Sequence, residues 1–208
     1  LGTGNKYQRE TDYTGNGIDT LQFVRSYNSV LSHRDRGLGA GWRYSYQREI
    51  LPDESNLTAT VWRDDGTQYV FALKEGHGIA PSGVIDTLEH TDTGWLYVTG
   101  NGVVEHYDAK GHLQRVEYPS GVVHHLDYDD AGQLQHVRDS RGAVLAFTWR
   151  AQHLRNVKLP DGRRASYDYD DAFNLVSVTH SNGLFDAMIA AFKTPARRYH
   201  YDNAKHPH

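Results

Sequence analysis

The chain has 208 residues, enough to bury a core as one β domain or two smaller ones, and it contains no cysteine. Disulfides, zinc-thiolate sites and thiol nucleophiles are therefore excluded. A net charge of −4, with acids and bases interspersed and no dense Lys/Arg stripe, argues against nucleic-acid binding. The 14 tyrosines, 20 glycines and 4 tryptophans favour strands joined by tight turns.

No targeting or membrane-spanning segment is visible in the sequence. The chain opens LGTGNKYQRE, without the basic and apolar stretches of a signal peptide. Its longest apolar run, residues 187–192, is too short to cross a bilayer, so we expect no membrane span. Because the sequence stops within a repeat, we expect a fragment or stub of a longer array.

Residues 1–102 form the lead-in region, which should fold as paired strands around sharp turns. TLQFVRSY, residues 20–27, alternates as a strand does and follows a TGNGID turn. GLGAGWRYSY, residues 37–46, places three alternating glycines before three rings on one strand face. This loop lacks the Lys-Ser/Thr of a phosphate-binding loop and leads into a strand rather than a helix. We therefore expect a backbone that turns tightly beneath bulky side chains.

Further hairpins are expected between residues 52 and 102. Asp65-Gly66 and Asn101-Gly102 suit two-residue primed turns, in which both central residues take positive φ. The intervening EGHGIAPSGVID, residues 75–86, is rich in glycine and proline and is predicted to be a loop or an edge excursion.

Residues 103–183 repeat one pattern four times. The copies read YDAKGHLQRVEYPSG from residue 107, YDDAGQLQHVRDSRG from 128, WRAQHLRNVKLPDG from 149 and YDDAFNLVSVTHSNG from 169. Their leucines, valines and closing glycines recur at steps of 21, 20 and 21 residues, which predicts stacked supersecondary units. The repeat positions are Tyr107, Asp108, Gly111, Leu113, Val116 and Gly121; Tyr128, Asp129, Gly132, Leu134, Val137 and Gly142; Trp149, Leu154, Val157 and Gly162; and Tyr169, Asp170, Leu175, Val178 and Gly183.

Each copy reads as a β-hairpin. The ring that ends the outgoing strand shares a face with the residue two positions earlier, so stacked hairpins would align Tyr107, Tyr128, Trp149 and Tyr169 in an aromatic ladder. The leucine and valine of the return strand are three apart, so either the leucine closes the turn or a bulge intervenes. The aspartate before the turn glycine should accept backbone N–H groups. The third copy has Arg150 at the position of this aspartate and is one residue shorter, so its turn should have a different conformation.

Residues 184–208 should hold a short helix and the start of a further, truncated repeat. LFDAMIAAFKTPA places apolar residues at helical spacing before a proline, which predicts a helix of at most two turns near residues 185–192. ARRYHYDN, residues 196–203, looks like the outgoing strand of a fifth copy.

Structural roles account for the residues that could carry chemistry. The 13 histidines show no tight ligand spacing, and the adjacent His124 and His125 point to opposite faces of a strand, so we predict no metal site. The acids recur because the turn recurs, whereas a glycosidase pair should be singular, and no G-x-S-x-G elbow occurs. We therefore predict no catalytic residue and no cofactor. An exposed aromatic ladder could still stack on sugar rings, which leaves carbohydrate binding open.

The Y-D-x-x-G-x-L-x-x-V core of YDAKGHLQRV and YDDAGQLQHV, with TGNKYQRETDY, FVRSYNS and GLGAGWRYSY upstream, resembles the Rhs proteins, a polymorphic-toxin family with YD repeats. The resemblance covers almost the whole chain. It implies a spiralling β shell around a C-terminal toxin or effector, secreted or delivered between bacteria by a secretion system whose components would be further partners. The self-cleaving plug region and the toxin are missing from this chain, so neither activity transfers to any of its residues.

The sequence thus predicts an all-β chain of antiparallel hairpins in a curved or spiralling sheet, acting as a non-enzymatic segment of a shell. The alternatives are a carbohydrate or cell-surface binding module that uses the aromatic ladder and, third, a hydrolase built on the Asp-rich turns. Burial of the ladder separates the first two. Unpaired strands at both ends of the sheet should also favour self-association.

Overall fold

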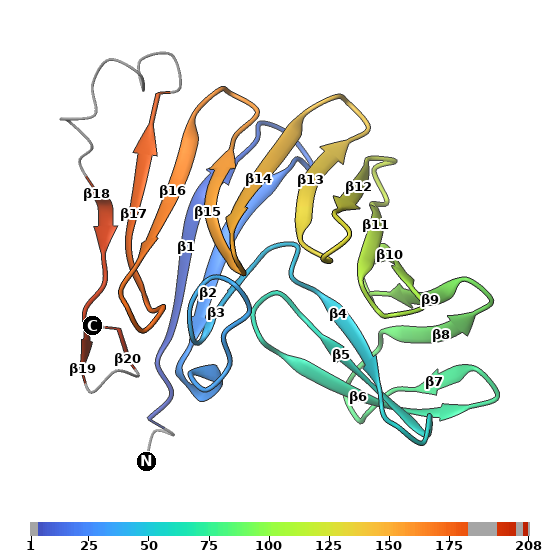
Figure 1. Ribbon diagram of the computed structural model, residues 1–208. Coiled ribbons are helices and arrows are strands. Elements are labelled where there is room, and N and C mark those ends of the chain that lie inside the picture. The colour runs from blue at the N-terminus through green and yellow to red at the C-terminus, as the bar shows by residue number, and fades with distance from the viewer. Residues whose placement is uncertain (1–3, 183–194, 203–205, 208) are drawn as a thin grey trace.

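The computed structural model describes residues 4–182, 195–202 and 206–207, and the fold is all-β, as predicted (Figure 1). Within these ranges the one helical segment is the 3-10 turn η1 (Ser29–Leu31). The helix expected near residues 185–192 lies outside the described residues. No helix in the described part of the chain is long and apolar enough to cross a membrane.

The strands form three antiparallel sheets. The first holds β1 (Tyr7–Thr14), β2 (Gln22–Asn28) and β3 (Trp42–Tyr44), and a two-stranded sheet holds β19 (Tyr201–Asp202) and β20 (His206–Pro207). The third has fifteen strands, each paired with the next one along the chain. They are β4 (Glu49–Pro52), β5 (Thr58–Trp62), β6 (Gln68–Lys74), β7 (His77–Ile79), β8 (Thr87–Thr91), β9 (Gly94–Val98), β10 (Val104–Asp108), β11 (Leu113–Glu117), β12 (Val123–Tyr128), β13 (Leu134–Asp139), β14 (Val144–Arg150), β15 (His153–Lys158), β16 (Arg164–Tyr169), β17 (Leu175–Ser181) and β18 (Pro195–Arg198).

Most hairpin turns share one geometry, which differs from the primed turn expected at Asp65-Gly66 and Asn101-Gly102. The Arg63 N–H donates to Thr67 O over 2.9 Å, and inside this bond the Gly66 N–H donates to Arg63 O over 3.1 Å. Within the loop, φ is positive only at Gly66. This is a type I turn closed by a glycine bulge, and residues 99–103 form it too. An L-residue such as Asp65 avoids left-handed backbone, and the bulge spares it that conformation.

The primed turn occurs instead inside the segment predicted to be a loop or edge excursion. Glu75 and Gly76, with φ of 51° and 81°, form the two-residue connection between Lys74 and His77. Residues 77–79 then form β7, which pairs with both β6 and β8. The prediction for residues 75–86 was wrong for this part, because backbone pairing on both sides outweighs the glycine content.

A bulge settles how the leucine and valine of each repeat share a face. In the first copy Tyr107 pairs with Leu113 while His106 pairs with Arg115, so the register shifts by one residue between the two rows. The same shift recurs in the other three copies. Both side chains therefore point inward, and the eight are at most 2% exposed: Leu113, Leu134, Leu154, Leu175, Val116, Val137, Val157 and Val178.

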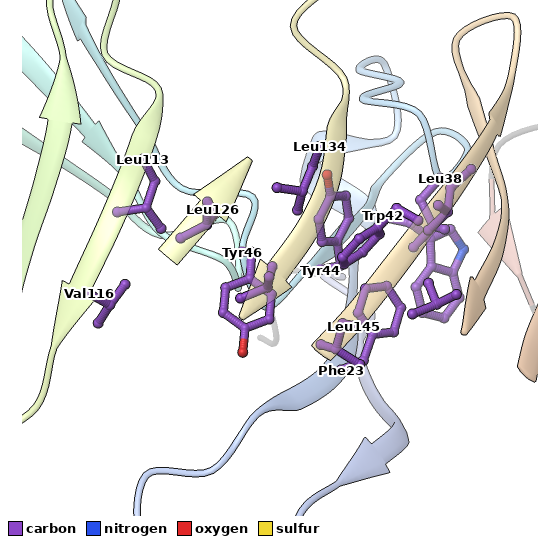
Figure 2. Close-up of a cluster of buried hydrophobic side chains, with 14 of the residues drawn as sticks. Phe23, Leu38, Trp42, Tyr44, Tyr46, Leu113, Val116, Leu126, Leu134 and Leu145 are labelled. Carbon is purple, nitrogen blue, oxygen red and sulfur yellow. The ribbon is translucent and has the colours of Figure 1, made fainter. Parts of the chain in front are cut away.

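The core lies where the first sheet packs on the inner face of the repeats. Figure 2 shows Phe23, Leu38 and Trp42 from the N-terminal segment facing Leu134 and Leu145 of the repeat strands. Phe23 contacts Phe147 edge-on, with ring centroids 5.7 Å apart. Burial of each such side chain contributes about 1.5–3 kcal/mol, so this contact fixes the first sheet on the repeats.

The large sheet bends until its first strand meets the first repeat turn (Figure 1). The Ile50 N–H of β4 donates to Gly111 O over 3.0 Å, and the backbone of Glu49 forms an isolated antiparallel β-bridge with that of His112. A Cβ on Gly111 would lie 1.7 Å from Ile50 O, so only glycine fits there. β4 pairs with β5 along one edge, and the first repeat turn partly covers its other edge. The expectation of open sheet edges at both ends is therefore wrong at β4.

Candidate functional site

The aromatic ladder is hydrogen-bonded from one repeat to the next. The Tyr128 hydroxyl donates to Leu113 O (2.8 Å), the Trp149 indole N–H to Leu134 O (2.8 Å), and the Tyr169 hydroxyl to Leu154 O (2.7 Å). Tyr201 continues the series with a 2.7 Å bond to Leu175 O. Each ring thus ties its own copy to the repeat leucine of the copy before it. Tryptophan can replace tyrosine because its N–H is also a donor.

The ladder is packed rather than displayed. Tyr107 is buried, and Tyr128, Trp149 and Tyr169 are half-buried against the core. The residues two positions before these rings, Glu105, Leu126, Phe147 and Tyr167, are all buried on the same face, as the alternation predicts. Burial raises the pKa of the Tyr128 and Tyr169 hydroxyls above the ordinary value, so both remain protonated donors at neutral pH.

The first buried charge cluster surrounds Glu105 on β10, which is 0% exposed. Its carboxylate accepts hydrogen bonds from Arg48 (2.6 Å), from Arg63 (2.7 and 2.8 Å) and from the Tyr107 hydroxyl (2.6 Å). Burial alone would raise the pKa of Glu105, but the charges of Arg48 and Arg63 outweigh it and hold the pKa at about 2. The carboxylate therefore stays ionised and joins three separate segments of the chain.

The second cluster centres on Arg25 of β2 and Asp12 of β1, whose side chains are 1% and 2% exposed. Two guanidinium nitrogens of Arg25 contact the two carboxylate oxygens at 2.5 and 3.0 Å. The Tyr167 hydroxyl donates to Asp12 over 2.8 Å, and Arg25 donates to the Tyr199 hydroxyl over 3.0 Å. This pair therefore attaches the first sheet to the fourth repeat and to Tyr199, the residue directly after β18. The Trp42 ring, 5.1 Å away, covers the guanidinium.

The glycine loop of the lead-in region docks on the irregular third turn. Gly37 O accepts the Leu154 N–H over 2.8 Å, and Asp35 accepts from the Gly37 and Gly39 N–H groups and from His153 (2.8, 3.1 and 2.7 Å). A Cβ on Gly37 would lie 2.8 Å from the Trp149 ring, so glycine permits the close approach. The bulky side chains above this loop thus come from the repeats as well as from its own strand.

Residues 107–148 and 149–184 match the RHS Repeat family, and residues 1–71 match a domain of unknown function, DUF6531. Residues 107–184 are therefore RHS repeats. No curated protein matches it. It is similar, at 14% identity, to a chain of the Photorhabdus luminescens Tc holotoxin pore with a mutated TccC3 (TM-score 0.38; 99% of this chain, 10% of that one). A structure of TcdB2-TccC3-Cdc42 is similar at 14% identity (TM-score 0.32; 84% of this chain, 10% of that one). The chain spans about a tenth of either, and TM-scores this low do not establish a shared fold.

The aspartates of the RHS repeats cap their own turns. In each of Asp108, Asp129 and Asp170 one carboxylate oxygen accepts the N–H groups two and four residues later, at 2.8 to 3.0 Å. The third copy differs, with only Ala151 and a glutamine between Arg150 and His153. These contacts satisfy backbone donors that would otherwise lack partners, which is the turn role expected from the sequence.

The histidines of this RHS-repeat protein form no metal cluster among residues 4–182 and the other described ranges. His124 is buried and His125 exposed, as expected for neighbours on a strand. His124 Nε2 lies 3.0 Å from Asp19 O, and its Nδ1 lies 3.4 Å from the hydroxyls of Tyr46 and Tyr118. Burial lowers the pKa of His124, so the ring is neutral at physiological pH.

The structure brings the repeat positions together in three rows: the inward leucines and valines, the aromatic ladder and the turn aspartates. Gly183 lies outside the described residues. Sequence reasoning missed both charge clusters. No spacing pattern in the sequence marks Asp12, Arg25, Arg48 or Arg63. Glu105 could have been noticed, because it stands two positions before the first ladder ring, where the other copies have the apolar or aromatic Leu126, Phe147 and Tyr167. A buried charge in such a column requires a partner from elsewhere in the chain.

Proposed function

We propose that this RHS-repeat chain is a non-enzymatic wall segment of a shell that encloses a toxin or effector polypeptide. The observation that supports this most is the uniform bond between copies, in which each ring donates to the leucine carbonyl of the copy before it. A wall joined by one repeated contact can be extended by further copies without new chemistry.

The lead-in region supports the proposal by fastening the start of the wall. Arg48 and Arg63 meet Glu105 of the first copy, while Asp12 and Arg25 meet Tyr167 of the fourth. Charges buried this deeply hold one arrangement, because separating either partner leaves an uncompensated charge in the core. These contacts hold the lead-in region against both the first and the fourth copy of the repeat.

The absence of enzymatic activity is part of the proposal. The turn carboxylates are occupied by backbone N–H groups of their own loops, and Glu105 and Asp12 are engaged with arginines. A hydrolase would need one acid with a raised pKa beside a second, free one. A glycan or peptide turnover that is lost on Asp170→Asn would contradict this part of the proposal.

The enclosed partner, its toxin activity and delivery through a secretion system, in competition between bacteria, are inferred from membership of the RHS-repeat family. The test is limited proteolysis of the complete gene product purified from its native cell. We expect an internal polypeptide that resists protease until the wall is opened by denaturant. The same protein carrying Glu105→Gln, which weakens the wall, should release that polypeptide to protease at lower denaturant. Equal cleavage of every segment in the native protein would refute enclosure.

A further inference from the structure

The chain contains the tripeptide Gly-Asn-Gly twice, at residues 15–17 and 100–102, and a β-branched residue follows each copy. Both copies lie in loops between strands, the first between β1 and β2 and the second between β9 and β10. A glycine after asparagine leaves its backbone nitrogen unhindered, because glycine has no Cβ. The two sites therefore share the same intrinsic chemistry, and a difference in their reactivity has to come from the fold.

The fold restrains the second site through Thr99. The Gly102 N–H donates to Thr99 O over 2.8 Å, and the Thr99 hydroxyl donates to the side-chain oxygen of Asn101 over 2.5 Å. The Val103 N–H donates to the same hydroxyl oxygen over 3.0 Å. The glycine nitrogen and the asparagine side chain are therefore both held in place, and neither can approach the other unless the turn opens.

The first site has none of these restraints. Asn16 is exposed, and neither its side chain nor the Gly17 N–H forms a hydrogen bond with the residues that the structure describes. The loop is anchored on either side of this pair, because the Gly15 N–H donates to Leu21 O over 3.1 Å and Thr20 is buried. Asparagine side chain, glycine nitrogen and solvent can therefore meet at this point in the folded chain.

We propose that Asn16 is a site of spontaneous covalent modification, at which the folded chain converts Asn16-Gly17 to an isoaspartyl linkage while Asn101 stays intact. The Gly17 nitrogen, after losing its proton to water or hydroxide, attacks the side-chain carbonyl carbon of Asn16. The new C–N bond forms, the bond to the side-chain amide nitrogen breaks, and that nitrogen takes up a proton and leaves as ammonia. Water then opens the resulting succinimide at either carbonyl, which gives isoaspartate or aspartate. The reaction consumes only water, and it is separate from the wall function.

The modified residue lies beside a contact between the lead-in region and the second copy. Arg141, in the closing turn of that copy, donates to Ile18 O and Asp19 O over 3.2 and 3.3 Å. A Cβ on Gly17 would lie 4.0 Å from a nitrogen of the same guanidinium. An isoaspartyl linkage lengthens the backbone directly before these carbonyls and adds a carboxylate next to Arg141. We therefore expect the modified chain to lose both of these hydrogen bonds.

The test is incubation of the 208-residue chain at mildly alkaline pH, followed by trypsin digestion and mass spectrometry. Trypsin cleaves after Lys and Arg, so the two sites fall in the separate peptides 10–25 and 75–110, each with one asparagine. Because the bonds at Thr99 must open first, we expect Asn16 to convert at least about tenfold faster than Asn101. In concentrated denaturant the two sites should convert at equal rates, because their local sequences match.

Two variants sharpen the comparison. Asn16→Gln should leave peptide 10–25 unmodified, because the longer side chain has to close a larger ring, which forms more slowly. Thr99→Val removes the hydroxyl that holds Asn101 and should speed its conversion by about threefold or more. The proposal is overturned if Asn16 and Asn101 convert at equal rates in the folded chain, if Asn101 converts faster, or if their rates differ as much in denaturant as in the folded chain.

The effect on the contact is measured on modified chain that ion exchange separates by its added charge. Its unfolding midpoint in urea should lie below that of the unmodified chain, and Arg141→Gln should remove this difference. A midpoint that is unchanged or higher after modification would overturn the loss of the Arg141 hydrogen bonds.

Discussion

Replacing Glu105 by glutamine tests how the wall is fastened. The substitution keeps the shape of the side chain and removes the charge that Arg48 and Arg63 share at 2.6 to 2.8 Å. Removing one partner from a buried ion pair leaves the others uncompensated, which costs about 3 to 5 kcal/mol. We expect the free energy of unfolding, from urea titration followed by tryptophan fluorescence, to fall by this amount at neutral pH.

The pH dependence gives an independent measure of the same charge. The pKa of Glu105 is about 2 in the folded chain against an ordinary value of 4.5. A pKa that is lower in the folded state adds stability above the unfolded value, and this stability is lost as the pH falls from 4.5 toward 2. The difference corresponds to about 3 kcal/mol. The wild-type chain should therefore lose about 3 kcal/mol more than Glu105→Gln across that window.

The matched control is Glu117→Gln, a carboxylate that is 39% exposed and lies 2.7 Å from Arg115. Exposed pairs of this kind contribute about 0 to 1 kcal/mol, so the control should barely move the midpoint. A cost below about 1 kcal/mol for Glu105→Gln, or acid profiles that run parallel in wild type and variant, would refute the inference that this carboxylate fastens the wall.

Three further predictions concern the repeats. Tyr128→Phe removes the donor to Leu113 O and should lower the free energy of unfolding by about 0.5 to 1.5 kcal/mol in urea titration, whereas an unchanged value would argue that the ladder is held by packing alone. Asp129→Ala frees two backbone N–H groups and should cost about 1 kcal/mol by the same assay, with Asp130→Ala as a control near zero. Burial lowers the pKa of His124, so its contribution to stability is present above the ordinary pKa of 6.5 and is lost as the pH falls below it. Between about pH 7.5 and about pH 5.5, His124→Gln should therefore lose less stability than the wild-type chain. An equal loss in both would show that another group takes up the proton that destabilises the fold.

Local features of the fold were predictable from the sequence because the same strand and turn pattern recurs in four copies. The spacing of leucine and valine required either a turn-closing leucine or a bulge, and the structure contains the bulge. The third turn differs as its missing residue indicates, residues 196–198 extend the sheet within β18, and Tyr201 joins the ladder. Backbone pairing of neighbours in sequence is a local property, which alternation and turn residues encode.

Contacts between distant segments were not predictable. Nothing in the spacing of Arg25 indicates that it meets Tyr199, 174 residues later. The covered edge of β4 likewise depends on how far the sheet bends, and no single hairpin determines that. The primed turn predicted at Asp65-Gly66 was wrong, because the same dipeptide fits a type I turn with a glycine bulge, and the primed turn at Glu75-Gly76 lies in a segment predicted to be a loop or an edge excursion.

Pairing between neighbouring copies is shorter than pairing within a copy, and this has a geometric consequence. β11 and β12, β13 and β14, and β15 and β16 each share only three residue pairs, all toward one end of the strands. At the other end, the leucine carbonyl bonds to a ring tip instead of to a neighbouring backbone. Each ring is therefore a wedge that holds two hairpins apart at one end only, so the sheet fans. We expect the size of this one side chain per copy to influence how far neighbouring hairpins fan, and Trp149 is the largest ring of the series.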